Sequence, residues 1–249
     1  METKLSKLYS DAKLAQFYEV SDQNRLDYKA IIELSKEANS ILDLGCGTGV
    51  LSVALSKNAH VVAVDSANAM LDIAKQRNGS TAVNWIEGDA REVRLDRKFD
   101  FIVLSGHAFQ VFLHAEDQLK VLKTIAVHLA DGASFIFDSR NPNFPESKER
   151  TKEQTRRNFR HSSLGEFEMW NCSSYDEETS ILTYENGYRL ASQVEEISAQ
   201  ERIKYTSVAE LNELLSIAGL EMGQCFGNWD QTPFHDHSKE IIILGRLKG

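Results

Sequence analysis

The chain has 249 residues, 42% of them hydrophobic, and a formal net charge of -9 at pH 7. This length allows one large α/β domain with an insertion, or two small domains. The acidic balance argues against tight nonspecific binding to nucleic acid, because such binding depends on Lys and Arg neutralising phosphates.

Nothing in the sequence predicts a membrane partner or export. No apolar run approaches the roughly 20 residues that span a bilayer, and residues 1–14 are too polar for a signal peptide. The cytoplasm is therefore the expected location. Cys46, Cys172 and Cys225 form no C-x-x-C pair, which favours reduced thiols over a disulfide framework or a zinc site.

Apolar residues recur at helical spacing over residues 5–18 and 25–38, and both segments are expected to be helices. The stretch from Ile41 to Gly49 then predicts a buried strand, a turn with glycines at alternate positions and the start of a helix. Glycine suits such a turn because it tolerates left-handed backbone angles and lets a ligand approach the main chain.

Asp43 decides which ligand this turn suits. A dinucleotide fingerprint has the spacing G-x-G-x-x-G and meets a pyrophosphate, which a carboxylate would repel. Here the spacing is G-x-G-x-G, and an acid lies two residues before Gly45. An acid favours a cationic ligand such as the amino group and sulfonium of S-adenosylmethionine. Asp65, at the end of the next apolar strand, lies where an acid accepts hydrogen bonds from ribose hydroxyls.

Strands and helices alternate after this turn, which predicts a parallel sheet with helices on both faces. The expected strands are residues 60–65, 82–87, 99–104 and 133–138, with helices at 67–77 and 116–129. Between residues 155 and 204 the segments become aromatic and β-branched, which favours an inserted antiparallel sheet. Asn186-Gly187 predicts a hairpin turn within it. A helix at 207–218 and strands at 220–226 and 239–244 complete the chain.

The glycine turn with Asp43 and Asp65 resembles the cofactor motif of class I S-adenosylmethionine-dependent methyltransferases. The similarity runs from about residue 15 to residue 246 and is most specific over 41–138. It implies a Rossmann-like α/β fold with a doubly wound, seven-stranded, mostly parallel sheet and an antiparallel last strand. The main domain would comprise residues 1–140 and 205–249, and residues 141–204 would form an antiparallel β cap over the substrate.

The resemblance also implies a set of residues around the methyl donor. In the family, an Asp at the position of Asp89 accepts from the adenine amino group and the next amide, that of Ala90 here, meets a ring nitrogen; the alternative is that Asp89 caps the turn. Tyr18 matches a tyrosine that closes over the methionine end of the cofactor and Met70 is a candidate contact of the adenine, with ordinary packing as the alternative for both. The predicted cofactor residues are Tyr18, Asp43, Gly45, Cys46, Gly47, Gly49, Asp65, Ser66, Met70, Gly88, Asp89, Ala90, Ser105, Gly106 and His107.

His107 has two interpretations. It lies in a loop similar to the glycine-histidine-x-x-glutamine loop of some bacterial small-molecule methyltransferases, and it is either a general base or a side chain that packs against the adenosine. The candidate substrate residues, for which packing or a surface ion pair is the alternative, are Gln110, Arg140, Trp170, Arg189, Tyr205, Trp229 and His235. No metal is expected, because His235 and His237 lack further ligands at a suitable spacing.

Six basic residues between Lys148 and Arg160 form either a solvated segment or a patch that attracts an acidic substrate. The sequence therefore predicts methyl transfer from S-adenosylmethionine to O or N of a small molecule, by a monomer or a homodimer. Three alternatives remain open: methylation of RNA or protein, an NAD-dependent oxidoreductase, and a noncatalytic protein that binds the cofactor.

Overall fold

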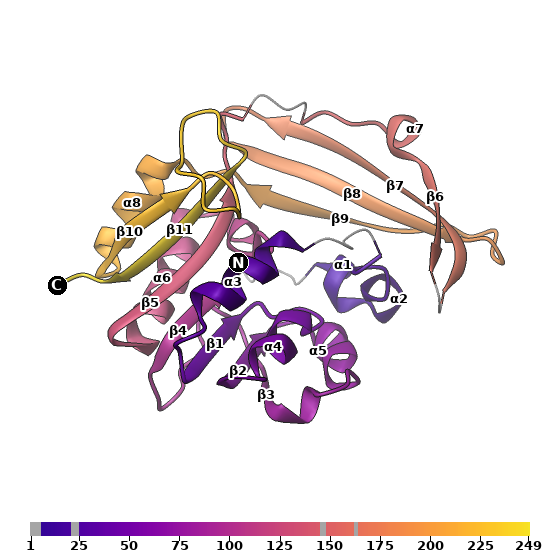
Figure 1. The fold of residues 1–249 in the computed structure, drawn as a ribbon. Helices are drawn as coiled ribbons and strands as arrows, with labels where there is room; N and C mark the ends of the chain where they lie inside the picture. Colours follow the sequence, from indigo (N-terminus) through magenta and orange to yellow (C-terminus); the bar gives the residue numbers. More distant parts are fainter. Residues whose placement is uncertain (1–5, 21–24, 145–147, 162–163) are drawn as a thin grey trace.

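The computed structural model describes residues 6–20, 25–144, 148–161 and 164–249. Its larger sheet has seven strands in the order β10-β11-β5-β4-β1-β2-β3 (Figure 1). The strands are β1 (Ser40–Leu44), β2 (His60–Asp65), β3 (Val83–Glu87), β4 (Phe99–Leu104), β5 (Leu129–Arg140), β10 (Leu220–Phe226) and β11 (Glu240–Leu247). Strands β1 to β5 pair in parallel, and only β11 runs against its neighbours β5 and β10. The predicted mostly parallel sheet with a reversed last strand is confirmed.

Strand β5 begins earlier than predicted, since Leu129 already pairs with Phe99 on β4. Other predicted elements shift at their ends. The helices of the main unit are α3 (Leu26–Leu34), α4 (Val50–Leu55), α5 (Asn68–Lys75), α6 (Ala115–His128) and α8 (Val208–Ile217). A capping box in which Ser207 and Glu210 bond each other's backbone amides fixes the start of α8.

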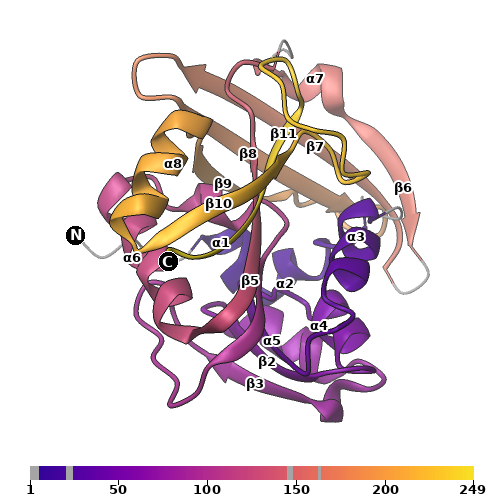
Figure 2. The ribbon, with the colours of Figure 1, turned by 60° about the vertical axis from the view of Figure 1, so that its left-hand side comes forward.

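Helices cover both faces of the main sheet, with α6 and α8 on one side and α3 and α4 on the other (Figure 2). Side chains alternate between these faces and build two separate cores. On β1, Leu42 packs with α6 and α8, whereas its neighbour Ile41 packs with α3 and α4. Strand β2 follows the same rule, because Val62 and Val64 belong to the first core and Val61 and Ala63 to the second. The continuous apolar strands of the sequence thus reflect burial on both faces.

The predicted helix over residues 5–18 is wrong as a single element, and its first residue, Leu5, lies outside the described residues. Two short helices replace it, α1 (Lys7–Ser10) and α2 (Ala12–Ala15). Asp11 between them has an extended backbone, and its side chain accepts a hydrogen bond from the Lys13 amide. Such a capping side chain starts a new helix and interrupts the old one.

A second sheet is inserted between β5 and α8 in the chain. Its four antiparallel strands are β6 (Arg157–His161), β7 (Gly165–Asp176), β8 (Ile181–Leu190) and β9 (Ile197–Lys204), preceded by the short helix α7 (Lys152–Thr155). The sheet arches over the N-terminal helices (Figure 1). Phe17, which follows α2, stacks on Tyr188 of β8 with ring centroids 4.3 Å apart, so the N-terminal segment is packed against the inserted sheet.

The predicted hairpin turn at Asn186-Gly187 is wrong. Both residues lie inside β8 and pair with β7 on one side and β9 on the other, and the turn between β7 and β8 lies at residues 177–180 instead. Gly187 is directly opposite Trp170, and a Cβ on Gly187 would collide with the indole ring. The glycine therefore makes room for a side chain in mid-strand, which is the other use of glycine in a sheet.

None of the helices in the described part of the chain is long and apolar enough to cross a membrane.

The contact between Gly187 and Trp170 gives a stability prediction. Gly187→Ala should lower the free energy of unfolding by about 1–3 kcal/mol, because the added methyl overpacks the site against the indole. Urea titration of the purified variant measures this cost. In a Trp170→Leu background the same change should be markedly cheaper. An equal cost in both backgrounds would show that the indole is not its cause.

Candidate functional site

A cavity of about 940 Å³ lies at the carboxyl edge of the main sheet, and residues of the inserted sheet and of the N-terminal helices also line it. Its floor is formed by the loops that follow β1, β2, β3 and β4 and by the end of β5. Open parallel sheets bind their ligands at this edge. The cavity brings together most predicted cofactor residues, namely Tyr18, Gly45, Gly47, Asp65, Ser66, Met70, Gly88, Asp89, Ala90, Ser105, Gly106 and His107.

The glycine turn has one face toward the cavity and one toward the core. Gly47 has a φ of 53°, and among the described residues the only atom within 4 Å of a Cβ placed there would be Tyr18 Cε1 at 3.8 Å, so its main chain is open to a ligand. Gly49, with a φ of 77°, is pressed against the Trp85 ring and Ala74 instead. Gly49 and Cys46 do not line the cavity.

Asp65 and Asp43 take different positions. Asp65 lines the cavity, where its carboxylate accepts from the amide of Gly47 at 2.7 Å and from that of Ala67 at 2.8 Å. Asp43 does not line the cavity and is 2% exposed, with Ser52 Oγ donating to it at 2.6 Å. Burial raises the pKa of Asp43 to about 7.

Asp89 lies at the cavity wall and is held by an arginine that the sequence did not single out. Arg91 Nη2 lies 2.6 Å from Asp89 Oδ2, and Arg91 Nη1 lies 3.2 Å from Asp117. Burial works to raise the pKa of Asp89, but the hydrogen bonds from Arg91 outweigh it and the pKa lies below its usual value. Asp89 therefore stays an ionised hydrogen-bond acceptor near neutral pH.

His107 occupies a corner between two carboxylates. Its backbone is left-handed, with a φ of 61°, and its amide donates to Asp138 Oδ2 at 3.1 Å. Its ring Nε2 lies 2.7 Å from Glu240 Oε2 and 3.4 Å from Asp138 Oδ2. Burial raises the pKa of Asp138 to about 6, although the charge of His107 acts in the opposite direction. All three side chains line the cavity.

The sequence did not single out Asp138 or Glu240. Asp138 ends a predicted strand, which is a usable signal, but Glu240 begins the reversed strand β11 and reaches the corner only through the pairing of β11 with β5. No spacing in the sequence announces that contact.

Arg140, Tyr205 and Trp229 line the cavity, as expected of substrate residues, whereas Gln110 lies behind it. Gln110 is fully buried, accepts from Arg140 Nη1 at 3.0 Å and donates to the carbonyl of Lys204 at 3.0 Å. It thereby ties the end of β5 to the end of β9. A buried glutamine with both ends bonded fixes the arginine beside it.

Trp170, Arg189 and His235 do not line the cavity. Successive side chains of a strand point to opposite faces, and the cavity face of the inserted sheet carries Met169, Asn171 and Ser173 on β7 and Leu182, Tyr184, Asn186 and Tyr188 on β8. Trp170 and Arg189 therefore point outward, Trp170 under Lys152 and Arg189 toward Glu168. His235 lies in the loop before β11, where its amide donates to Ser238 Oγ.

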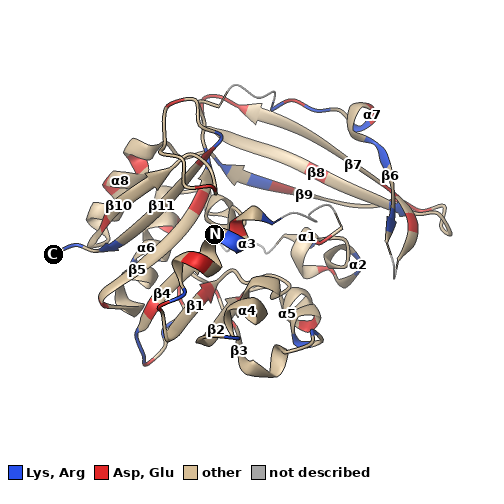
Figure 3. Ribbon diagram, in the orientation of Figure 1, with Lys and Arg blue, Asp and Glu red and all other residues tan. Residues whose placement is uncertain are grey.

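The Lys and Arg residues of the basic segment are spread along the chain from before α7 into β6 (Figure 3). Their side chains divide between the cavity and the outer surface. Lys148 and Arg150 line the cavity, with Lys148 Nζ 3.9 Å from the Tyr175 ring centroid and 4.8 Å from that of Tyr205. Lys152 and Arg156 form ion pairs outside it with Glu196, and Arg156 also with Glu168. The segment is therefore not a continuous patch.

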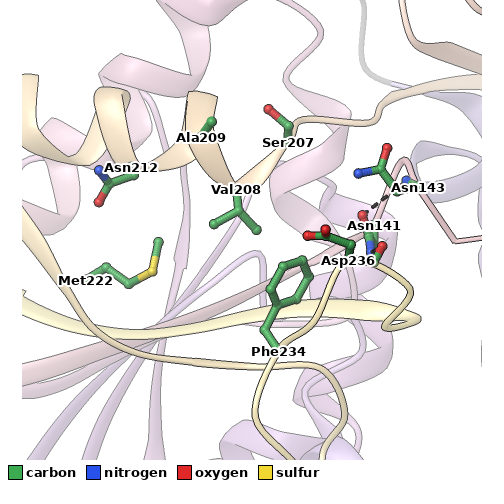
Figure 4. A pocket seen from close by; sticks show the side chains of 9 residues that line it. All are labelled: Asn141, Asn143, Ser207, Val208, Ala209, Asn212, Met222, Phe234 and Asp236. Carbon is green, nitrogen blue, oxygen red and sulfur yellow. Dashed lines mark hydrogen bonds between the residues drawn. The ribbon is translucent and has the colours of Figure 1, made fainter.

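A smaller cavity of about 470 Å³ lies between α8, β10 and the loop before β11 (Figure 4). Its lining holds one titratable side chain, Asp236, and no residue of the glycine turn. Asn141 borders both cavities and binds the Asp236 carbonyl through Nδ2. The chemistry of the site is thus in the larger cavity.

The buried Asp43 gives a pH prediction. Its folded pKa, about 7, exceeds the unfolded value of about 3.9, so the contribution of Asp43 to stability is present at low pH and is lost as the pH rises through 7. Asp43→Asn keeps an acceptor for Ser52 without the charge, and should raise the free energy of unfolding at pH 8 by about 1–4 kcal/mol. Urea titrations at pH 5 and pH 8 test this, with exposed Asp72→Asn as the control. A gain no larger at pH 8 than at pH 5 would contradict it.

A family model described as "Methyltransferase domain" matches residues 41–132. The cypemycin N-terminal methyltransferase of a Streptomyces species is 27% identical over 215 residues, covering 84% of this chain and 83% of that protein. A malonyl-[acyl-carrier protein] O-methyltransferase of Bacillus cereus is 29% identical over 147 residues, and the match spans 55% of this chain and 53% of that protein.

Solved structures show the same fold. The CcbJ methyltransferase of Streptomyces caelestis superposes with a TM-score of 0.79 at 18% identity, over 97% of this chain and 98% of that one. An S-adenosylmethionine-dependent methyltransferase of Clostridium acetobutylicum gives 0.79 at 19% identity, over 95% and 98%. Together with the glycine turn and the acids at the strand ends, the matched methyltransferase domain and the sequence relatives support a class I enzyme that uses S-adenosylmethionine as its methyl donor, and the solved structures share its fold.

Proposed function

We propose that this enzyme methylates O or N of a small molecule bound beneath the inserted sheet. The proposal rests on one observation: the cavity of about 940 Å³ is continuous from the glycine turn to the inner face of that sheet. Pockets for small ligands have volumes of about 300–1,000 Å³. Residues 141–204 act in this proposal as the substrate cap, and residues 1–140 and 205–249 as the catalytic domain.

The cavity fits the methyl donor at the glycine turn. Gly47 presents open main chain, Asp65 offers a carboxylate for the ribose, and Asp89 with Ala90 faces the place of the adenine. When bound, the donor supplies an activated methyl group on a positively charged sulfur. The chain itself has to align the acceptor, exclude water and remove a proton where the acceptor carries one.

His107 is the proposed general base. It lies in the cavity after β4, and its ring is oriented by Glu240 at 2.7 Å. An imidazole that takes the acceptor's proton becomes a cation, and the two carboxylates beside it stabilise that charge. The same arrangement holds the ring in one orientation before the reaction.

The curated relatives include both a protein named as an N-terminal methyltransferase and proteins named as O-methyltransferases. An RNA acceptor is disfavoured by the net charge of -9 and by the division of the basic segment into paired surface residues and cavity residues. An NAD-dependent reaction is disfavoured because the glycine spacing is G-x-G-x-G, one residue shorter than the dinucleotide fingerprint G-x-G-x-x-G.

Calorimetry with S-adenosylhomocysteine tests donor binding. Wild-type protein should bind this product, and Asp65→Asn should weaken binding about 10- to 100-fold, because a charged acceptor toward the ribose is lost. Asp72→Asn, on the exposed face of α5, should bind like the wild type. No binding by the wild type would refute the proposed function.

Kinetics of His107→Gln test the base. With an acceptor found by screening for S-adenosylhomocysteine release, kcat at neutral pH should fall about 10²- to 10⁴-fold, the usual loss when a general base is removed. The affinity for S-adenosylhomocysteine, measured in parallel, should change little. If affinity falls and kcat does not, His107 packs against the adenosine instead.

A further inference from the structure

The reacting end of the cavity carries an excess of negative charge. Asp138 and Glu240 are 1% and 8% exposed, and both line the cavity beside His107. Among the described residues, Asp138 Oδ1 is buried without a hydrogen-bond partner. Two carboxylates and one imidazole thus share a corner in which one carboxylate oxygen is unsatisfied.

The neighbouring cations do not neutralise this corner. Arg25 is bound by Asp27, with Nη2 2.6 Å from Oδ2, and lies near Gly106. Arg140 is opposite Glu240 in the strand register, but its guanidinium donates to Gln110. In the described part of the chain, no Lys or Arg forms an ion pair with Asp138 or Glu240, whose ion-pair partner is His107.

We infer that the acceptor is an aliphatic amine that enters as its ammonium ion and is bound by Asp138 and Glu240. The inference rests on the proposed function and specifies its substrate class. Buried charges are costly unless they are paired. An ammonium ion supplies the missing positive charge and has N–H groups that can donate to the unsatisfied oxygen. A neutral alcohol adds no positive charge, so the two carboxylates would have only the His107 imidazole beside them.

The reaction balances with the groups present. One N–H bond of the ammonium breaks, and the proton passes to the His107 imidazole, which Asp138 and Glu240 then stabilise. The freed lone pair forms the N–CH₃ bond while the S–CH₃ bond breaks and its electrons stay on sulfur. The products are S-adenosylhomocysteine and a methylated ammonium, and His107 returns its proton to solvent.

Matched pairs of compounds that differ only in an amino or a hydroxyl group test the inference, for example benzylamine with benzyl alcohol and glucosamine with glucose. Release of S-adenosylhomocysteine should occur with amines, and the matched alcohols should react at less than about a tenth of the rate. Glu240→Gln and Asp138→Asn should each raise the KM of the best amine about 10- to 100-fold. Glu213→Gln, exposed on α8, is the matched control and should not change it.

The inference would be overturned if alcohols were methylated in preference to amines, or if the amine KM were unchanged in both variants. It would also be overturned if the amines were neither methylated nor bound by the protein loaded with S-adenosylhomocysteine.

Loss of activity in EDTA and its recovery with Mg²⁺ would overturn it as well. His107, Asp138 and Glu240, whose ligand atoms lie within 4.8 Å of one another, would then hold a metal. Binding of S-adenosylhomocysteine by each protein shows that it is folded. If the wild-type protein did not bind S-adenosylhomocysteine, the result would instead count against the proposed function.

Discussion

The direction of the strands in the main sheet determines where the chemistry of this protein lies. Parallel strands end at one edge, so Asp65 at the end of β2, Asp89 after β3 and His107 after β4 meet there although they are far apart in sequence. The reversed strand β11 starts at that same edge. Its first residue, Glu240, consequently joins the groups that follow the parallel strands, and the hydrogen bond from His107 to Glu240 links the two strand directions.

The sequence predicts the main sheet well because its signals are local. Buried strands, a glycine turn and acids at strand ends can be recognised within a few residues, and most of the cofactor residues they indicate do line one cavity. Asp43 and Gly49 show the limit of that reasoning, because whether a motif residue faces the ligand or the core depends on packing partners such as Ser52 and Trp85. Glu240 could not be found from a motif, since only the strand pairing brings it to the site.

The sequence predicts that the insertion is an antiparallel sheet, but it does not predict which residues face the cavity or where the hairpin turn lies. A strand exposes alternate residues to each face, so an error of one residue in position reverses every assignment. Trp170 and Arg189 are attractive substrate residues by composition, yet the residues next to them, Met169, Asn171 and Tyr188, face the cavity. Asn186-Gly187 misled in a similar way, because the glycine serves the indole of Trp170 in mid-strand.

The segment that follows α2 joins two parts of the site through adjacent residues. Phe17 stacks on Tyr188 of the inserted sheet, and Tyr18 lies over Gly47 of the glycine turn and close to Gly106. A ligand that orders this segment from one side therefore also orders the wall on the other side. Binding linkage is reciprocal: if donor binding raises the affinity for the acceptor through this segment, acceptor binding raises the affinity for the donor by the same factor. If donor and acceptor bind as proposed, we therefore expect their affinities to be coupled through residues 17 and 18.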